Sequence, residues 1–208
     1  QNLWAARAVG PIYAYVIVDG GLGTVPDEVT RAVISSGPTF VIAPHYRLTA
    51  DRYSGAMAVL TTSADALQWA YVRGMVHPAL DPTDAAAIGD VVAPVMQREL
   101  NTQLAIITCN HHGAVTAVPE SEPLLHVQRH RATARLPVLT EPAMPAFAVG
   151  AVEGYLRGME LAQSMRFANL LGFLAAREAN PAIVTEDHTD AWMLEQRQQP
   201  EGKMRSIL

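Results

Sequence analysis

The pattern of apolar and polar positions predicts alternating strands and helices in the first half of the chain. Short β-branched, apolar runs between turn residues are typical of buried strands, whereas apolar residues three and four positions apart are typical of helices. The predicted strands are Ile12–Val18, Thr39–Ala43, Ala56–Thr61 and Gln103–Cys109. Because Ile12–Val18 is too apolar to alternate, we expect it to be covered on both faces of the sheet.

Helix-start signals place three helices between these strands. Thr24 and Asp27 have the spacing of a capping box, and so do Thr62 and Asp65. A proline lowers the stability of a helix interior, so Pro94 should kink or split the third helix. The predicted helices are Asp27–Ser35, a segment from Thr62 to about Gly74, and a segment from Asp81 to about Leu100.

The second half of the chain changes character twice. Four prolines between positions 119 and 142 leave room only for short extended pieces, which we place at Leu124–Arg131 and Ala132–Leu139. No proline occurs from Ala146 to Ala179, where leucine, alanine, methionine and glutamate dominate. This composition predicts one long helix near 146–179, followed by a short last helix at about 190–198.

Small residues recur every four positions along the predicted long helix. Such a stripe lets another backbone approach closely, whereas mid-helix glycines cost roughly 1 kcal/mol each relative to alanine. Packing must recover that cost, so we expect the stripe to be an interface. Its members are Ala146, Gly150, Gly154, Gly158 and Ala162.

These elements indicate an α+β fold class, with a single mixed sheet of about four to six strands packed against helices. The 208 residues fit one domain that covers 1–208. Because the chain begins with Gln1 instead of methionine, we interpret it as a processed product or a segment of a longer protein.

Composition narrows the classes of function. A net charge of −5 argues against a chain built wholly around nucleic acid, because phosphate binding needs clustered cations. One cysteine excludes an intramolecular disulfide and favours a reducing, intracellular location. No apolar run has the roughly 18 residues that a membrane span needs. We therefore expect no disulfide partner and no membrane contact.

The segment Thr108–Val115, TCNHHGAV, holds the only cysteine and two adjacent histidines. His126 and His130 are four residues apart and share one face of a helix or strand. Together with Cys109 and His111 or His112 they would form a zinc-type ligand set. The alternative, which we favour, makes Cys109 a small buried residue and leaves the histidines exposed at a turn or interface.

Other candidate sites carry weaker signals. Asp19–Gly23 lies between a strand and a helix but lacks the spacing of phosphate loops, so we interpret it as a tight turn. A basic segment without interleaved aromatic residues could contact RNA or a partner protein through Arg129, Arg131 and Arg135. No catalytic residue and no cofactor are predicted.

The chain is rich in alanine, proline and methionine, poor in lysine, and has scattered histidines. In this composition it resembles capsid-shell proteins of double-stranded RNA viruses, over its whole length but without any matched motif. The resemblance implies a structural, self-assembling protein that acts through contacts with copies of itself or shell neighbours, in a virion. The alternative hypothesis is a bacterial enzyme with a His/Cys site around Thr108–Gly113, a metal-assisted hydrolase. We favour the assembly protein over the enzyme.

Overall fold

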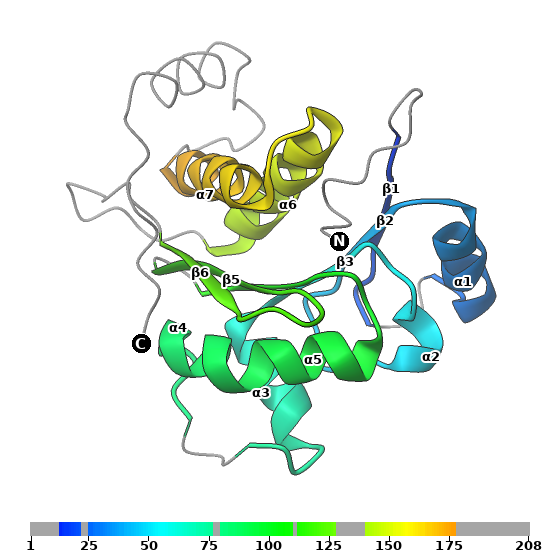
Figure 1. The fold of residues 1–208 in the computed structure, drawn as a ribbon, viewed down its shortest axis with the longest axis horizontal. Coiled ribbons are helices and arrows are strands. Elements are labelled where there is room, and N and C mark those ends of the chain that lie inside the picture. Colours follow the sequence, from blue (N-terminus) through cyan, green and yellow to red (C-terminus); the bar gives the residue numbers. More distant parts are fainter. Residues whose placement is uncertain (1–12, 22–24, 77–79, 110–111, 128–139, 178–208) are drawn as a thin grey trace.

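One mixed sheet of six strands forms the centre of the protein in the computed structural model (Figure 1). The structure describes residues 13–21, 25–76, 80–109, 112–127 and 140–177. The strands, adjacent in chain order, are β1 Tyr15–Val18, β2 Thr39–Ile42, β3 Ala58–Thr62, β4 Ala105–Thr108, β5 Gly113–Ala117 and β6 Leu124–Val127. β1 to β4 are parallel, and β5 and β6 are antiparallel to their neighbours. The predicted single mixed sheet is confirmed, although β5 was not predicted.

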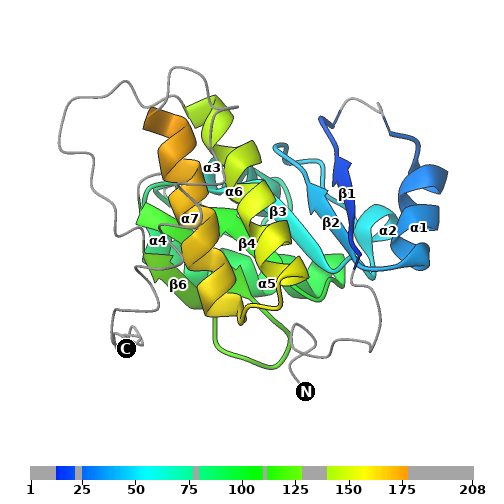
Figure 2. The same ribbon diagram turned by 90° about the horizontal axis from the view of Figure 1, so that it is seen from above.

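Two layers of helices cover the sheet (Figures 1 and 2). Helices that connect the parallel strands lie on one face, and a helical hairpin packs on the other. The first layer contains α1 Asp27–Ser36, α2 Ala50–Tyr53, α3 Ser63–Tyr71, α4 Ala85–Ala87, the π-helix η1 Ile88–Val92 and α5 Ala93–Leu100. The second layer is α6 Thr140–Leu156 and α7 Leu161–Arg177.

Alternation along the strands decides which residues enter which core. Val41 and Val59 belong to the cluster under the connecting helices, whereas their neighbours Phe40 and Leu60 belong to the cluster under α6 and α7. Successive side chains of a strand point to opposite faces, so an uninterrupted apolar run fills both cores. This explains why the central strands read as continuous hydrophobic segments.

The helix-start predictions meet different outcomes. The Thr62 hydroxyl accepts a hydrogen bond from the Asp65 backbone N–H at 3.1 Å and donates to the Asp65 carboxylate at 2.6 Å, which confirms the capping pair. α1 begins at Asp27 as predicted, but its N-cap is Pro26 and no side chain caps it. α2 was not predicted, because a helix of four residues leaves no periodic signal.

Pro94 divides the predicted third helix, as its position indicated. The segment becomes α4, a π-helical turn and α5, and Pro94 stands in the first turn of α5, where its missing N–H is tolerated. The cap of α4 is Asp84, whose carboxylate accepts from the Ala87 N–H at 3.0 Å. The predicted start at Asp81 is therefore three residues too early.

The first strand is less covered than its sequence predicted. Val16 and Val18 keep 48% and 63% of their surface exposed, whereas Ile17 is 7% exposed. β1 is the edge strand of the sheet, and α6 and α7 lie mainly over the strands that follow it in the sheet (Figure 2). The expectation that this strand is covered on both faces is wrong for the described part of the chain.

The predicted single helix near 146–179 is also wrong. It is divided into α6 and α7 by a turn in which Gly158 adopts a left-handed φ of 81°. The chain therefore reverses, and the two helices pack against each other. A Cβ on Gly150 would lie 2.6 Å from the Ala168 Cα, and one on Gly154 would lie 2.7 Å from the Ser164 Cβ.

The small-residue stripe thus serves a contact within one chain. Gly150 and Gly154 face α7, Gly158 lies in the turn, and Ala162 belongs to the next helix. The expected close approach of backbones occurs, but between neighbouring helices of the same molecule. Among the described residues, no helix combines the length and apolar character that crossing a membrane requires.

Candidate functional site

A buried carboxylate stands where the first strand ends. Asp19 directly follows β1 and is 0% exposed. One carboxylate oxygen accepts the Gly21 N–H at 2.9 Å, and the other accepts the Tyr53 hydroxyl in a short hydrogen bond. Gly21 has a φ of 73° and packs under the His45 ring. The predicted tight turn is confirmed at Asp19–Gly21.

Arg52 joins this turn to the start of α1. Its guanidinium Nη2 lies 2.8 Å from the Asp19 carboxylate, and Nη1 lies 2.7 Å from the exposed Asp27 carboxylate. Nη2 also donates to the Val25 carbonyl at 2.6 Å. One cation therefore neutralises two acids and connects the end of β1 to Val25 and the first residue of α1.

His45 completes the cluster from the end of β2. Its Nε2 lies 3.7 Å from the Asp19 carboxylate and is a buried atom without a hydrogen-bond partner in the described residues, as is the Arg52 Nε. Burial lowers the pKa of His45, although the charges of Asp19 and Asp65 oppose this. At neutral pH the ring is therefore uncharged.

The Asp19 carboxyl is held in its ionised form. Burial raises its pKa, but the hydrogen bonds from Tyr53 and Gly21 and the charge of Arg52 together bring the pKa below its usual value. Burial and the neighbouring Asp19 carboxylate raise the pKa of Tyr53. The phenol therefore keeps its proton and acts as a donor. The cluster is an ion-pair network that shapes the edge of the sheet.

The first turn of α6 stands at the same edge of the sheet. Phe40 in β2 packs edge to face on Tyr155 late in α6, with ring centroids 5.4 Å apart. Ile42, the last residue of β2, lines a pocket with Ala148. α6 therefore runs antiparallel to β2, and its first residue, Thr140, lies roughly 12 Å beyond Ala148 at the rise of an α-helix.

The carboxyl ends of β1 to β4 thus meet the starts of α1, α3 and α6, and we call this region the carboxyl edge. In open α/β sheets, ligands bind outside the carboxyl ends of parallel strands, near the point where connections change from one face to the other. That change occurs here between β6 and α6 (Figure 2). The carboxyl edge is therefore the candidate ligand site.

Two ligands of the predicted Cys/His metal site, Cys109 and His126, do not come together. Cys109 belongs to the core under the connecting helices, whereas His126 is opposite Ala114, which belongs to the core under α6 and α7. Opposed residues of antiparallel strands share a face, so the two side chains point away from each other across the sheet. Throughout the described ranges, no group of three His, Cys, Asp or Glu residues could hold a metal ion.

His126 is buried within the fold, whereas the sequence placed it at the surface or at an interface. It is 7% exposed, its Nε2 lies 2.8 Å from the Thr116 hydroxyl, and its carbonyl accepts from the Asn169 amide at 2.9 Å. Burial and the nearby charge of Arg166 lower its pKa to about 4. The side chain is therefore a neutral part of the contact between the sheet and α7.

This buried histidine should make stability depend on pH. The pKa of a histidine in the unfolded chain is near 6.5, so the unfolded chain binds a proton at His126 below that pH. The folded chain binds this proton only near pH 4 and below. We expect the free energy of unfolding to fall by about 2 kcal/mol between pH 7 and pH 5. Urea unfolding of the native chain and of His126→Gln measures this. An equal fall in both proteins would contradict the assignment.

Cys109 is a buried apolar residue, which confirms the favoured interpretation. It is 0% exposed, and burial raises the pKa of its thiol to about 12. A thiol reagent should therefore react roughly a hundredfold more slowly with the folded chain than with the chain in denaturant. Equal rates of Ellman's reagent in the two states would show that the thiol is accessible.

Several predicted site residues lie outside the described residues. These are His111, His130, Arg129, Arg131 and Arg135, together with the predicted strand Ala132–Leu139. The structure tests neither the basic segment as a contact for RNA or a partner nor the metal ligands among these residues.

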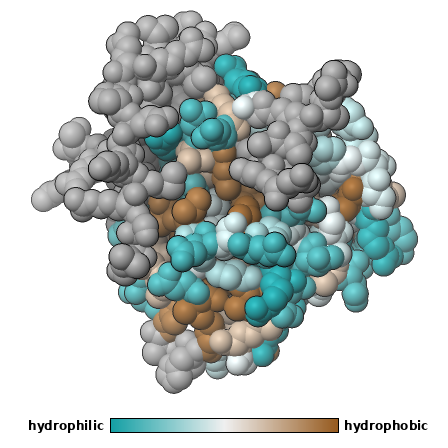
Figure 3. Space-filling model, viewed as in Figure 1, coloured by the Kyte–Doolittle hydropathy of each residue, from teal (hydrophilic) through white to brown (hydrophobic). Residues whose placement is uncertain are grey.

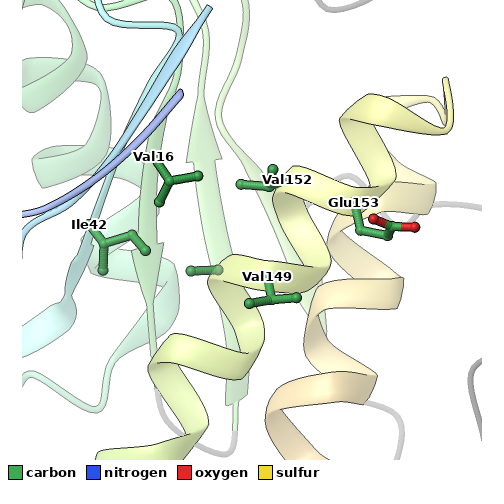
Figure 4. A pocket seen from close by; sticks show the side chains of 6 residues that line it. Val16, Ile42, Val149, Val152 and Glu153 are labelled. Atoms are coloured by element: carbon green, nitrogen blue, oxygen red, sulfur yellow. The ribbon is translucent and has the colours of Figure 1, made fainter. Parts of the chain in front are cut away.

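A small apolar pocket lies between β1, β2 and α6, with a volume of about 140 Å³ (Figure 4). Val16 and Ile42 face Val149 and Val152 across it, and Glu153 stands at its rim. The Glu153 carboxylate accepts a 2.5 Å hydrogen bond from Arg157. In the view of Figure 3, patches of apolar residues lie among the hydrophilic residues of the surface. Glu153, paired with Arg157, is the one titratable residue among those that line the pocket.

The fold was compared with known proteins. No protein-family model matches the sequence, and no curated protein matches it either. The ribokinase from Cryptococcus neoformans in complex with ADP matches 89% of this chain at 14% identity, with a TM-score of 0.65. The Burkholderia thailandensis nucleoside kinase in complex with ADP-inosine matches 99% of this chain at 18% identity, with a TM-score of 0.64. The Thermotoga maritima ribokinase matches 87% of this chain at 11% identity, with a TM-score of 0.61.

The chain has a ribokinase-like fold. It spans 56–61% of the length of these three kinase chains. The neighbours are carbohydrate and nucleoside kinases, which corrects the interpretation as a capsid protein with a structural role in a virion. The metal-assisted hydrolase is also wrong, because Cys109 and His126 face opposite sides of a fold shared with kinases. The capsid interpretation was wrong because it rested on composition, and residue frequencies carry no information about the order of strands in a fold.

The sequence analysis missed the polar cluster at the carboxyl edge. Asp19 was recognised only as a turn residue, although an acid placed directly after an apolar strand is a signal for a position at this edge. Arg52 and Tyr53 lie 33 and 34 positions further along the chain, and only the parallel pairing of β1 and β2 brings them together with Asp19.

Proposed function

We propose that this chain is part of a small-molecule kinase-type protein and that its carboxyl edge binds a sugar or a nucleoside. The observation that carries the proposal is the match of the fold to sugar and nucleoside kinases over 86–99% of the chain. A likeness in fold does not itself fix an activity, so the ligand class is a hypothesis to be tested.

The geometry of the carboxyl edge supports this ligand class. Four parallel strands end there in polar residues or turns, and the Asp19 network holds two of those ends rigidly together. Thr108 is half-buried at the end of β4; its hydroxyl donates to the Thr61 carbonyl at 3.3 Å and can accept a hydrogen bond from a sugar hydroxyl. A rigid edge with hydroxyl and amide groups suits a ligand recognised by several hydrogen bonds.

Gly20 offers a way to block this edge without disturbing the fold. A Cβ at this position would meet no atom within 4 Å. Gly20→Phe should therefore abolish the rise in melting temperature that ribose, inosine or adenosine causes, while the melting temperature without ligand changes by less than about 2 °C.

Ser36→Phe is the matched control for this variant. Ser36 is the exposed last residue of α1, at the opposite edge of the sheet, so its replacement should leave the ligand effect intact. If no sugar or nucleoside raises the melting temperature of the native chain, or if both variants respond as the native chain does, the proposed site is wrong.

Three further expectations from the sequence stay proposals. A homo-oligomer would be detected by sedimentation of the full chain. An intracellular location agrees with the single cysteine and with a ligand of this class. That the 208 residues form one domain is the third of these proposals.

A further inference from the structure

The kinases that share this fold raise the question of a phosphate site. Two of the kinase structures with this fold are complexes with ADP or with an ATP analog, and a triphosphate carries several negative charges. Helix N-termini are the usual places for such groups, because their backbone N–H groups are unpaired and their dipoles favour anions. Among the described residues, three helices of at least eight residues begin at the carboxyl edge: α1, α3 and α6. The three-residue α4 begins a further helical run, and the carboxylate of its N-cap residue Asp84 already accepts the Ala87 N–H at 3.0 Å.

The start of α1 is already occupied by acids of the chain itself. Asp27 and Glu28 stand exposed in its first turn. The nearest cation is Arg52, which is paired with Asp27 at 2.7 Å and with Asp19 at 2.8 Å. A phosphate at this helix end would meet two negative charges and an arginine that is already neutralised.

The start of α3 is closed in a similar way. The Asp65 N–H, one of the unpaired donors of the first turn, is bonded to the Thr62 hydroxyl at 3.1 Å. The Asp65 carboxylate is bonded to the same hydroxyl at 2.6 Å, so a negative charge already lies at the positive end of the helix dipole. This helix end satisfies its own donors and repels a second anion.

The row of backbone donors at the start of α6 is interrupted instead. Its first six residues are Thr-Glu-Pro-Ala-Met-Pro, and prolines at positions 142 and 145 have no N–H. A phosphate cradle needs several consecutive N–H groups that converge on the ligand. α6, which begins at the carboxyl edge on the other face of the sheet, therefore cannot provide an unbroken series of N–H groups.

From these three helix ends we infer that the carboxyl edge of this chain accepts the uncharged sugar or nucleoside and rejects phosphate groups. The chain then recognises the acceptor molecule of a kinase reaction without binding the phosphoryl donor. The inference rests on the proposed function for the identity of the ligand. The exclusion of phosphate rests on the charges and donors of α1, α3 and α6 alone.

Titration of the full 208-residue chain with adenosine, ATP with Mg²⁺, and inorganic tripolyphosphate tests the inference. Adenosine and ATP differ only in the triphosphate, so the ratio of their dissociation constants measures what the phosphates contribute. We expect ATP to bind no more tightly than adenosine and tripolyphosphate not to bind. Binding of ATP at least tenfold tighter than that of adenosine, any binding of tripolyphosphate, or transfer of phosphate from ATP to a nucleoside would overturn the inference.

The two proposals fail differently. If neither sugars nor nucleosides bind and tripolyphosphate does not bind, the proposed function is wrong and the exclusion of phosphate stands. If nucleosides and tripolyphosphate both bind, the proposed function stands and the exclusion is wrong.

Removing charge from α1 provides a positive test of the cause. Asp27→Asn/Glu28→Gln deletes two negative charges at the helix start and releases one side of Arg52, so tripolyphosphate should bind measurably to this variant at concentrations at which the native chain shows no binding. Glu99→Gln is the control, because Glu99 lies in the last turn of α5 at the opposite edge. No gain in the double variant, or an equal gain in the control, would show that these acids do not exclude phosphate.

Discussion

Asp19→Asn should lower the free energy of unfolding by about 3–5 kcal/mol, the cost of removing one partner from a buried ion pair. Asp19 is fully buried, and its carboxylate accepts from Gly21 and Tyr53 while it neutralises Arg52. The asparagine amide removes the negative charge of Asp19. It also places an NH₂ donor among groups that are themselves donors, namely the Gly21 N–H, the Tyr53 hydroxyl and the Arg52 guanidinium. The guanidinium is then left mostly buried with a single exposed acid.

Asp27→Asn is the matched control for this result. Asp27 contacts the same arginine at 2.7 Å, but its side chain keeps 57% of its surface exposed. Exposed ion pairs contribute about 0–1 kcal/mol, so this variant should be nearly as stable as the native chain. Urea unfolding of both variants at pH 7 measures the difference. Similar stabilities would show that the Asp19 network does not hold the carboxyl edge together.

Gly150→Leu should cost more than about 3 kcal/mol or prevent folding, at the upper limit of overpacking effects. A Cβ at this position would lie 2.6 Å from the Ala168 Cα and 3.1 Å from its backbone nitrogen. The clash is with backbone, so it can be relieved only by moving α7 away from α6 and away from the core it covers.

Val149→Leu introduces the same side chain one position earlier. Val149 is 61% exposed, so the control should change the free energy of unfolding by less than about 1 kcal/mol. Thermal and urea unfolding of the two variants measure the contrast. Equal stability would mean that α6 and α7 do not pack as closely as the structure places them.

The sequence contained enough information for most of the sheet. The apolar runs at β2, β3 and β4 are buried on both faces, and that burial produces the pattern that revealed them. β5 was missed because its five residues, GAVTA, follow a turn and include four small or polar ones. Thr62 and Pro94 acted as predicted because capping and a missing N–H are local effects.

The helical hairpin and the site needed information from distant parts of the chain. Gly158 looked like another member of a small-residue stripe, and only the reversal of the chain shows that it ends α6 in a left-handed turn. Cys109 and His126 are close in sequence, but the pleat of the sheet places them on opposite faces. The Asp19 network requires β1 and β2 to pair in parallel, which no short motif announces.

The most direct test of the central claim, that the carboxyl edge binds a sugar or a nucleoside, is amide chemical-shift mapping of the ¹⁵N-labelled chain during titration with inosine and ribose. The account predicts that shifts concentrate at the ends of β1 to β4, at Gly20, His45, Asp65 and Thr108, and spare Ser36 and Glu99 at the opposite edge. Shifts that concentrate at the opposite edge, or no shifts at millimolar ligand, would contradict it.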